Sequence, residues 1–256
     1  MTDDIRAAAA RYYDLTPQFP NDVRYYRALI PSPEASVLEL GCGTGRVLMQ
    51  LAPRCAFIHG IDRSASMLAI CRQKVRDAKL PPDKVGISTD DISHFELHRK
   101  FDLIMAPWRV FQNLETDAQV DGVFACIRRH LAPSGSCVLN VFKPKWPRDE
   151  LLRRWLTDDE TFAWEVPLQG GRLTCHDRRQ RLNRDPLVLY PELVLRRYEG
   201  EALVDEATLQ IPMRCYYPAE FASLVSSQGF RIVERCGGYA GEPYGEGPEL
   251  VIQFAR

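Results

Sequence analysis

Short apolar runs alternate with amphipathic runs between residues 37 and 142, and this alternation constrains the fold more than any other feature of the sequence. The runs that we expect to form strands are residues 37–40, 56–61, 85–88, 101–106 and 137–142, and those that we expect to form helices are residues 45–52, 65–78 and 116–131. Strands separated by helical segments pair in parallel, with the helices as crossover connections. The pattern therefore predicts an α/β fold built on a doubly wound sheet.

The segments on either side of this region have different patterns of apolar and polar residues. Residues 1–34 predict helices at 5–13 and 22–29, which prolines separate. After the core of residues 35–145, period-two stretches with turn signals predict antiparallel hairpins over about residues 161–214. We therefore expect residues 146–216 to form an inserted antiparallel β cap. Residues 217–256 then predict a helix at 218–228 and two strands, 230–234 and 250–255, that complete the core sheet.

Composition excludes several classes of protein. The 256 residues, 45% of them hydrophobic, can bury one substantial core plus an insertion. Lys and Arg total 33 against 34 Asp and Glu, so the charge gives no reason to expect a nucleic acid or an anionic membrane as partner. The start of the chain has no apolar core of signal-peptide length, and we expect a cytoplasmic protein. The eight cysteines are scattered without zinc spacing, which predicts no metal.

Three glycines at alternate positions, Gly41, Gly43 and Gly45, follow the first predicted strand. A loop between a buried parallel strand and a helix presents backbone N–H groups at the carboxyl edge of the sheet. Glycines there let a ligand, or a left-handed backbone, come close. A dinucleotide fingerprint favours Gly or Ala at the position of Arg46. The loop therefore disfavours a nicotinamide dinucleotide but leaves it open.

Acidic residues follow the next two predicted strands. Asp62 ends the second strand about twenty residues after the loop, where a carboxylate can accept hydrogen bonds from both hydroxyls of a ribose. Asp91 and Ile92 follow the third strand, where a carboxylate can accept from an adenine amine and an apolar neighbour can pack on the ring. Asp90 is the alternative to Asp91. Three strand ends thus predict an adenosine-bearing ligand.

In combination these motifs resemble the class I S-adenosylmethionine-dependent methyltransferases. The resemblance is carried by Val37 to Gly45, Gly60 to Ser64, Met67 with Leu68, Asp91 with Ile92, and residues 101–104 and 127–142. It implies a Rossmann-like, seven-stranded sheet whose last strand is antiparallel. It also implies S-adenosyl-L-methionine as the cofactor.

The same resemblance assigns roles to single residues. It places Gly41, Gly43 and Gly45 at the methionyl part of the cofactor, Asp62 at the ribose, and Asp91 and Ile92 at the adenine. The remaining members of its cofactor-binding set are Tyr13, Glu39, Arg63, Met67 and Pro107. Glu39 either orders the glycine loop or reaches the methionyl ammonium, and Tyr13 closes the site as part of an N-terminal lid, with Tyr12 facing the core or the reverse. The plainer alternatives are that Glu39 is solvated, Met67 is core and Asp62 caps a helix.

The acceptor side is predicted around the end of the fourth strand. Residues 107–114 resemble a Pro-Phe-Arg-x-Phe-Gln-x-Leu pattern of bacterial small-molecule methyltransferases, with Trp108 in place of the usual Phe. Arg109 either binds an acceptor carboxylate or phosphate or forms a structural ion pair. Gln112, three residues on, can share its face and point into the pocket. His176, in the predicted cap, is a candidate general base, although a lone histidine on a strand is more often surface or core.

Methyl transfer from a sulfonium is an in-line displacement that asks little of side chains beyond alignment in a dry pocket. The sequence therefore predicts a methyltransferase that acts on an O or N atom of a small molecule. A protein that holds the same cofactor without catalysis, as a regulator or assembly subunit, is the alternative, and an NAD-dependent oxidoreductase is a weaker one. The apolar alternation of the hairpins suggests a homodimer interface.

Overall fold

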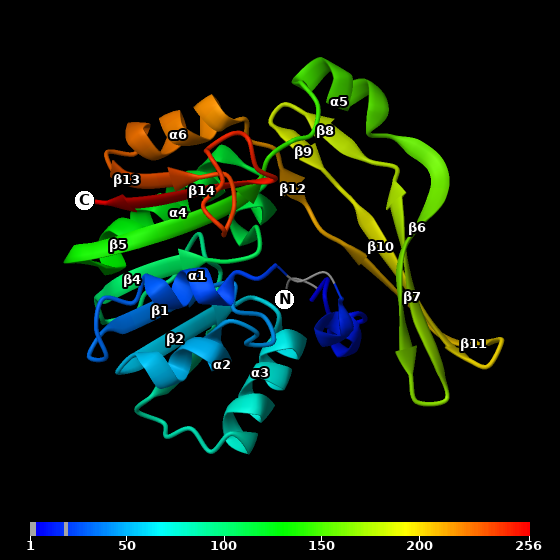
Figure 1. Ribbon diagram of the computed structural model, residues 1–256, viewed down its shortest axis with the longest axis horizontal. Helices are drawn as coiled ribbons and strands as arrows, with labels where there is room; N and C mark the ends of the chain where they lie inside the picture. Colours follow the sequence, from blue (N-terminus) through cyan, green and yellow to red (C-terminus); the bar gives the residue numbers. More distant parts are fainter. Residues whose placement is uncertain (1–3, 18–19) are drawn as a thin grey trace.

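The computed structural model describes residues 4–17 and 20–256, which form an α/β core with a separate β cap (Figure 1). Seven strands make the main sheet in the order β13-β14-β5-β4-β1-β2-β3. Their bounds are β1 Ser36–Leu40, β2 Phe57–Asp62, β3 Val85–Thr89, β4 Phe101–Ala106, β5 Leu131–Phe142, β13 Arg231–Cys236 and β14 Glu249–Ala255. The strand β14 runs antiparallel to both neighbours, and the pairings among β5, β4, β1, β2 and β3 are parallel. The predicted doubly wound sheet with an antiparallel last strand is confirmed.

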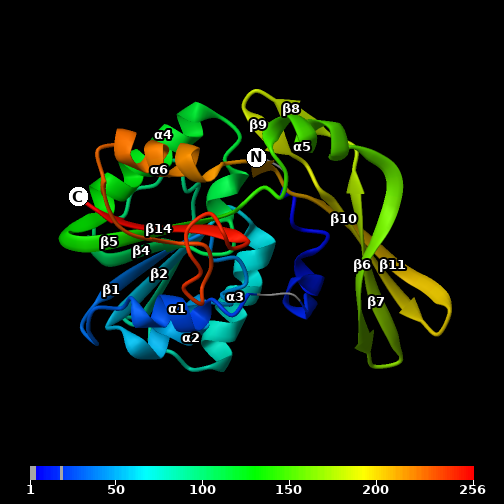
Figure 2. The same cartoon turned by 45° about the horizontal axis from the view of Figure 1, so that its top comes forward.

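Helices cover both faces of this sheet (Figure 2). Their bounds are α1 Val23–Ala28, α2 Leu48–Leu51, α3 Ala65–Asp77, α4 Asp117–His130 and α6 Pro218–Ser227. One buried cluster joins the sheet to α4 and α6, with Phe124 and Phe221 fully buried. A second joins the other face to α1, α2 and α3 through Tyr26, Leu48 and Leu68. These two layers hold the strand ends rigidly at the edge where the predicted ligand residues lie.

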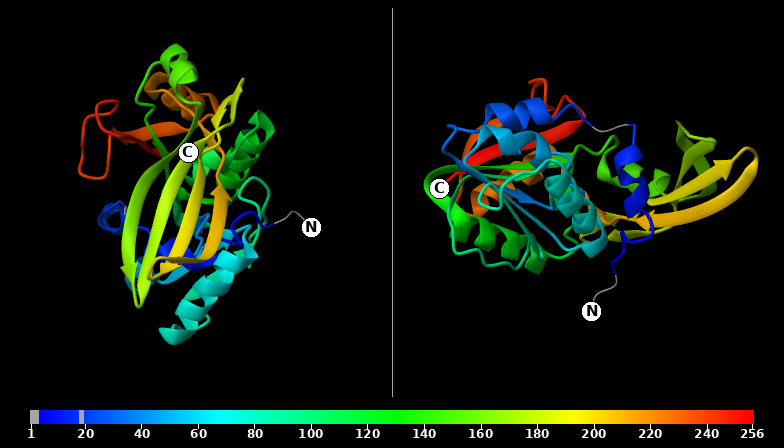
Figure 3. Two further views of the ribbon diagram at one scale, coloured as in Figure 1. Left: turned by 90° about the vertical axis from the view of Figure 1, so that its right-hand side faces the viewer. Right: turned by 90° about the horizontal axis from the view of Figure 1, so that it is seen from below.

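The chain between residues 148 and 214 forms the cap. Its elements are α5 Arg148–Arg154, β6 Thr157–Leu168, β7 Gly171–Arg179, β8 Leu182–Arg184, β9 Leu187–Leu189, β10 Glu192–Glu199, β11 Ala202–Gln210 and β12 Met213–Arg214. Four strands form an antiparallel sheet in the order β11-β10-β7-β6, which curves beside the core (Figure 3). A three-stranded sheet, β12-β9-β8, lies where the cap rejoins the core, and the sequence did not predict it as a separate sheet.

Two predicted helices differ from the expectation. The helix predicted at residues 5–13 is replaced by turns and a 3-10 helix, η1 Ala10–Leu15. This segment lies between core and cap (Figure 1), where contacts to both replace helical regularity: Asp4 accepts from Ser66, and Tyr12 donates to Asp205. The helix predicted from residue 45 begins at Leu48, because Gly45 has a φ of +81°, outside the helical region.

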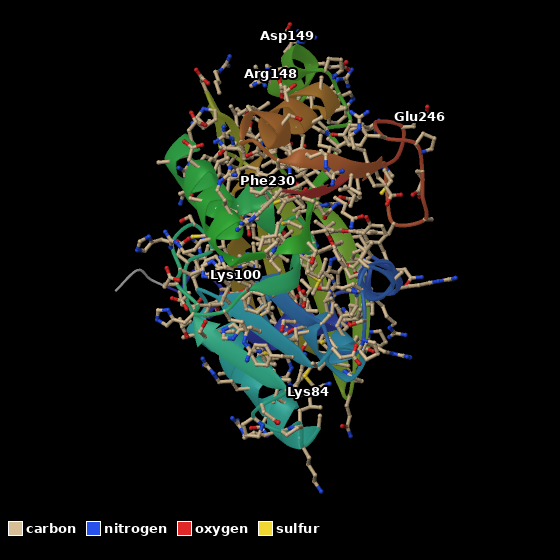
Figure 4. All side chains as sticks on the ribbon, turned by 90° about the vertical axis from the view of Figure 1, so that its left-hand side faces the viewer. Lys84, Lys100, Arg148, Asp149, Phe230 and Glu246 are labelled. Atoms are coloured by element: carbon tan, nitrogen blue, oxygen red, sulfur yellow. The ribbon has the colours of Figure 1, made fainter. Side chains whose placement is uncertain are left out.

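The strand predicted at 137–142 is longer than expected, since β5 starts at Leu131, directly after α4. Figure 4 views the end of the core opposite the cap, where the amino ends of the parallel strands lie. There the labelled Lys84 and Lys100 donate to the carbonyl oxygens of Cys55 and Arg129 and so close the loops. The remaining short helices are η2 Ala52–Arg54 and η3 Val110–Asn113. The carboxyl edge, facing the cap, is left for a ligand.

Candidate active site

A cavity of about 260 Å³ opens at the carboxyl edge of the sheet, between the core, the N-terminal segment and the cap. The core lines it with Gly41, Gly43, Asp62, Arg63, Met67, Asp90, Asp91, Ile92, Trp108, Arg109, Val110, Asn113, Leu114 and Gln119. The N-terminal segment adds Arg6 and Tyr13, and the cap adds Pro191, Leu193, Ile211 and Met213. Most of the residues predicted for the cofactor are therefore brought together.

The three glycines of the loop have different surroundings. Gly41 and Gly43 line the cavity with φ values of +66° and +53°. A Cβ on Gly43 would meet Met67 Cε at 3.4 Å and Asp62 Oδ2 at 4.0 Å, which are ordinary van der Waals contacts, so a side chain there would not clash with the protein. Gly45 does not line the cavity: a Cβ there would lie 2.7 Å from Cys71 Sγ of α3. The missing side chain of Gly45 therefore makes room for helix packing, and its expected contact with the methionyl part of the cofactor stays a prediction.

Asp62, at the end of β2, is buried and ties the loop to the next helix. Its Oδ2 accepts from the backbone N–H of Gly43 at 2.9 Å, and its Oδ1 accepts from that of Ser64 at 2.8 Å. A carboxylate offers about four lone-pair sites, so two remain for a ligand. The hydroxyl of Ser64 caps α3 by accepting from Met67 N–H. Asp62 thus has a structural role as well as a place in the cavity wall.

Glu39 lies under the glycine loop, only 3% exposed. Its Oε2 is buried and has no hydrogen-bond partner among the described residues. Burial raises the pKa of this carboxyl well above its ordinary value, although the nearby charge of Arg46 opposes the shift. A solvated Glu39 is therefore excluded. Glu39 does not line the cavity, so its contact with a methionyl ammonium stays a prediction. The orphaned oxygen is the kind of group that a cationic ligand atom would satisfy.

Arg46, the residue that disfavours a dinucleotide, forms a bidentate ion pair with Asp22 at the start of α1. The two N–O distances are 2.6 and 2.7 Å, and the Asp22 side chain is fully buried. Nothing in the local pattern marked Asp22, because the pairing joins residues 24 apart in the chain. The pair anchors the N-terminal segment to the helix that follows the glycine loop.

The ends of β2 and β3 and the first turn of α3 form the part of the cavity wall where the sequence predicts adenosine. Arg63, Met67, Asp91 and Ile92 all line the cavity, and Met67 does so while 1% exposed. Asp91 Oδ1 accepts from both the N–H and the hydroxyl of Ser93, which fixes its side chain. The geometry leaves the choice between Asp90 and Asp91 open, because both line the wall.

The N-terminal segment covers the cavity. Tyr13 lines it, and burial raises the pKa of its phenol. Tyr12 faces away and is buried against the cap cluster of Leu173 and Leu195 rather than the main core. Asp14 holds the segment down, since Oδ1 accepts from the Thr44 hydroxyl at 2.7 Å and Oδ2 pairs with Lys74. Tyr13 thus lies on the side of the cavity and Tyr12 on the side of the cap, and closure of a bound cofactor by Tyr13 stays a prediction.

The turn after β4 gives Arg109 a partner from the far end of the chain. Its Nε donates to Oε1 and Oε2 of Glu249 at 3.1 and 3.3 Å, and its Nη2 also donates to Oε1. Arg109 also lines the cavity, but its contacts with Glu249 support the alternative that it forms a structural ion pair. Pro107 is buried and absent from the lining, so its cofactor-binding assignment lacks support, and Trp108 takes its place in the wall.

Gln112 and His176 are not brought to the cavity. Gln112 is fully buried, donates to the Arg214 carbonyl at 2.8 Å and accepts from Phe142 N–H at 2.7 Å, so it braces β5 against the cap. His176 lies on the face of β7 opposite the buried Cys175, near Glu160 and Arg196. Gln112 therefore does not point into the pocket. The general-base role of His176 stays a prediction, and its place outside this cavity favours the alternative of a surface or core histidine.

The sequence did not predict several residues that line the cavity. The cap residues Leu193 and Ile211 looked like ordinary strand positions, and only the packing of the cap on the core brings them to the site. Asn140 does not line the cavity but bonds to Arg109, which does, and its polar side chain within the apolar run of β5 marked it as unusual in the sequence.

Within residues 4–17 and 20–256, no group of three His, Cys, Asp or Glu side chains is arranged to hold a metal ion. Over the same residues, no helix combines the length and apolar character needed to cross a membrane.

Comparisons with known proteins show similarity to methyltransferases. Residues 37–135 match a family described as methyltransferase domain. A dTDP-3-amino-3,6-dideoxy-alpha-D-glucopyranose N,N-dimethyltransferase of Streptomyces fradiae is 30% identical over 151 residues, which cover 56% of this chain and 55% of that protein. A malonyl-[acyl-carrier protein] O-methyltransferase of Priestia megaterium is 30% identical over 43% of this chain and 37% of its own. The chain spans about half the length, or less, of these curated relatives.

Solved structures extend the likeness of fold to the whole chain. A methyltransferase from Clostridium acetobutylicum aligns with a TM-score of 0.75 at 16% identity, covering 96% of this chain and 97% of that one. An amino pentose methyltransferase from Micromonospora echinaspora aligns with a TM-score of 0.70 at 21% identity, covering 97% and 96%. The fold is the one seen in these methyltransferase structures, and residues 37–135 are similar to a methyltransferase domain.

Proposed function

We propose that the protein transfers a methyl group from S-adenosylmethionine to an O or N atom of a small molecule, and that nitrogen is the favoured acceptor. The donor half of the cavity supports the first part. Gly43 brings bare backbone to the cavity wall, Asp62 keeps acceptor capacity for ribose hydroxyls, and the orphaned Oε2 of Glu39 suits an ammonium. These three features fit the methionyl and ribose parts of one ligand.

The acceptor half carries the preference for nitrogen. Trp108, Val110, Leu193, Ile211 and Met213 give it an apolar wall. Among the described residues that line the cavity from the cap and from the turn after β4, none is a carboxylate, a histidine or a thiol. An alcohol needs a base to lose its proton, whereas a neutral amine already has a free lone pair. An apolar wall also favours the neutral amine over its ammonium form.

The chain's own residues then act by binding and alignment. When bound, S-adenosylmethionine supplies an electrophilic methyl group on a sulfonium with a neutral leaving group. The glycine loop and Asp62 orient the donor, Tyr13 and the cap exclude water, and the apolar wall holds the acceptor in line. The relatives are consistent with this acceptor, because the Streptomyces fradiae protein and the Micromonospora protein are named for methylation of amino sugars or an amino pentose.

The test is turnover. Purified protein with S-adenosylmethionine and a panel of primary amines, amino sugars and phenols should release S-adenosylhomocysteine with an amine, and the rate should rise as pH approaches the pKa of that amine. Asp62→Asn should lower the affinity for S-adenosylhomocysteine at least tenfold, and the exposed control Asp158→Asn should not. Tight binding without turnover would favour a non-catalytic regulator, turnover with phenols alone would refute nitrogen, and binding of NAD instead would favour the oxidoreductase.

Two further parts of the proposal concern assembly and location. The cap exposes Phe162, Leu203 and Val204, so we propose a homodimer through the cap. Light scattering after size exclusion should give twice the mass of 29.2 kDa, and Phe162→Glu should return it to the single value. The expected cytoplasmic location stays a prediction, which cell fractionation would test.

A further inference from the structure

Two adjacent non-glycine residues in the cavity wall have left-handed backbones. Trp108 has a φ of +53° and Arg109 a φ of +64°. Such a conformation is unfavourable for residues with a Cβ, and it persists only where the surroundings hold it. The pair ends β4 and turns the chain into η3, directly at the acceptor wall.

Two buried side chains hold this turn. Asn140 of β5 accepts the backbone N–H of Arg109 on its Oδ1 at 3.0 Å, and its Nδ2 donates to Oε2 of Glu249 at 2.9 Å. Glu249 of β14 in turn accepts from the guanidinium of Arg109. Asn140 is fully buried and Glu249 is 6% exposed. The three residues close a hydrogen-bonded ring across β4, β5 and β14, three adjacent strands of the sheet in Figure 1.

The polar side chains of this ring are unusual in strands whose neighbouring residues are apolar. The neighbours Leu139, Val141 and Leu250 are apolar and fully buried, as a central sheet position requires. A buried amide and a buried carboxylate are tolerated when their hydrogen bonds are satisfied, and such a network then specifies one geometry. The geometry specified here is that of the turn, because both members bond to Arg109.

The turn controls what lies on either side of it. A Cβ on Gly41 would lie 2.5 Å from Val110 Cγ1, so the residue after Arg109 packs directly on the glycine loop. Trp108, Arg109 and Val110 all line the cavity. A change in this turn would therefore move the part of the cavity wall that these three residues form, and Val110 would carry part of the change to the glycine loop.

We propose that Asn140 and Glu249 are positioning residues that hold the left-handed Trp108–Arg109 turn and thereby place the acceptor. Glu249 also satisfies the charge of Arg109, so this arginine serves as part of the clamp and not as a receptor for an acceptor carboxylate. The inference rests on the proposed function, since it concerns the acceptor of that reaction.

The test compares Asn140→Leu and Glu249→Gln with a matched control. Gln253→Leu removes another side-chain bond between β14 and β5, the 3.1 Å bond from Gln253 Nε2 to the Ser136 hydroxyl, and Gln253 does not line the cavity. Four quantities are measured: melting temperature, hydrogen exchange of a peptide covering residues 107–113, the Kd of S-adenosylhomocysteine, and kcat and KM for the best amine of the panel.

In Asn140→Leu and Glu249→Gln we expect at least tenfold faster exchange of the turn and at least a tenfold loss of kcat/KM for the amine. The Kd of S-adenosylhomocysteine should change by a smaller factor than kcat/KM does, and Gln253→Leu should leave the exchange, the Kd and kcat/KM unchanged. Unchanged exchange in both variants, or an equal loss of kcat/KM in Gln253→Leu, overturns the proposal. If the wild-type protein methylates no amine, the proposed function fails and the acceptor role fails with it. The exchange measurement then decides by itself whether the ring holds the turn.

Discussion

The glycine loop offers a prediction that separates ligand contact from packing within one motif. Gly43→Ala and Gly45→Ala make the same chemical change at left-handed positions two residues apart. For an alanine at such a backbone, the strain is roughly 1–2 kcal/mol. Beyond this shared strain the two sites differ, because only Gly43 faces the cavity.

The structure sets the size of each effect. At Gly45 the new Cβ would lie 2.7 Å from Cys71 Sγ, against at least 3.4 Å for an ordinary contact. Overpacking of a core typically costs about 1–3 kcal/mol, so Gly45→Ala should lose roughly 2–5 kcal/mol of stability in total. At Gly43 the Cβ meets nothing closer than 3.4 Å, so the loss of stability should be the strain alone. Its methyl group would instead occupy ligand space and weaken binding tenfold or more, about 1.4 kcal/mol.

Urea denaturation measures the stability of each variant, and titration calorimetry measures its affinity for S-adenosylhomocysteine. Gly170→Ala is the matched control, because Gly170 has a φ of +79° and a Cβ there would meet nothing within 4 Å. It reports the strain alone. The reasoning about packing is refuted if Gly45→Ala is no less stable than Gly170→Ala. The assignment of Gly43 to the ligand is refuted if Gly43→Ala binds as tightly as the wild type.

Three further predictions concern single side chains. Glu39→Gln should be more stable than the wild type at pH 8. Because the pKa of Glu39 is raised in the folded state, wild-type stability falls as pH rises from the ordinary carboxyl range through that raised value. Urea denaturation across pH should show higher stability of the variant at pH 8 and a weaker dependence of its stability on pH. Arg46→Met should cost about 3–5 kcal/mol in urea denaturation, because it leaves the fully buried Asp22 carboxylate uncompensated, and a loss below about 1 kcal/mol would contradict a buried pair. His176→Ala should keep kcat/KM within twofold in the amine assay, and a tenfold loss would restore the general-base hypothesis.

The core sheet could be predicted because its elements depend on local pattern. The strand β4 has the predicted bounds, Phe101–Ala106, since a strand buried on both faces needs a continuous apolar run. The helices α3 and α4 match their predicted ranges within one residue at each end, and each begins at a side-chain cap, Ser64 or Thr116. The N-terminal helix could not be predicted correctly, because contacts with the core and cap determine that segment's conformation.

The meeting of the expected donor residues at one cavity could also be predicted from sequence, for a topological reason. Parallel strands bring their carboxyl ends to one edge, so residues just after β1, β2 and β3 must meet whatever their side chains are. Gly43, Asp62 and Asp91 follow that rule and line one cavity. Gly45 shares their motif, but whether a missing Cβ admits a ligand or a helix depends on α3, which the motif does not contain.

The acceptor half was decided by the tertiary structure alone. Arg109 meets Glu249 across 140 residues of sequence, and no spacing rule connects them. The face of β7 that carries His176 depends on strand register, since a shift of one residue would exchange it with Cys175. Sequence by itself determined the sheet and the edge at which the expected donor residues gather, because both arise from short-range pattern repeated at strand ends. The acceptor wall arises from long-range packing of cap, β14 and the turn after β4, which only the folded chain brings together.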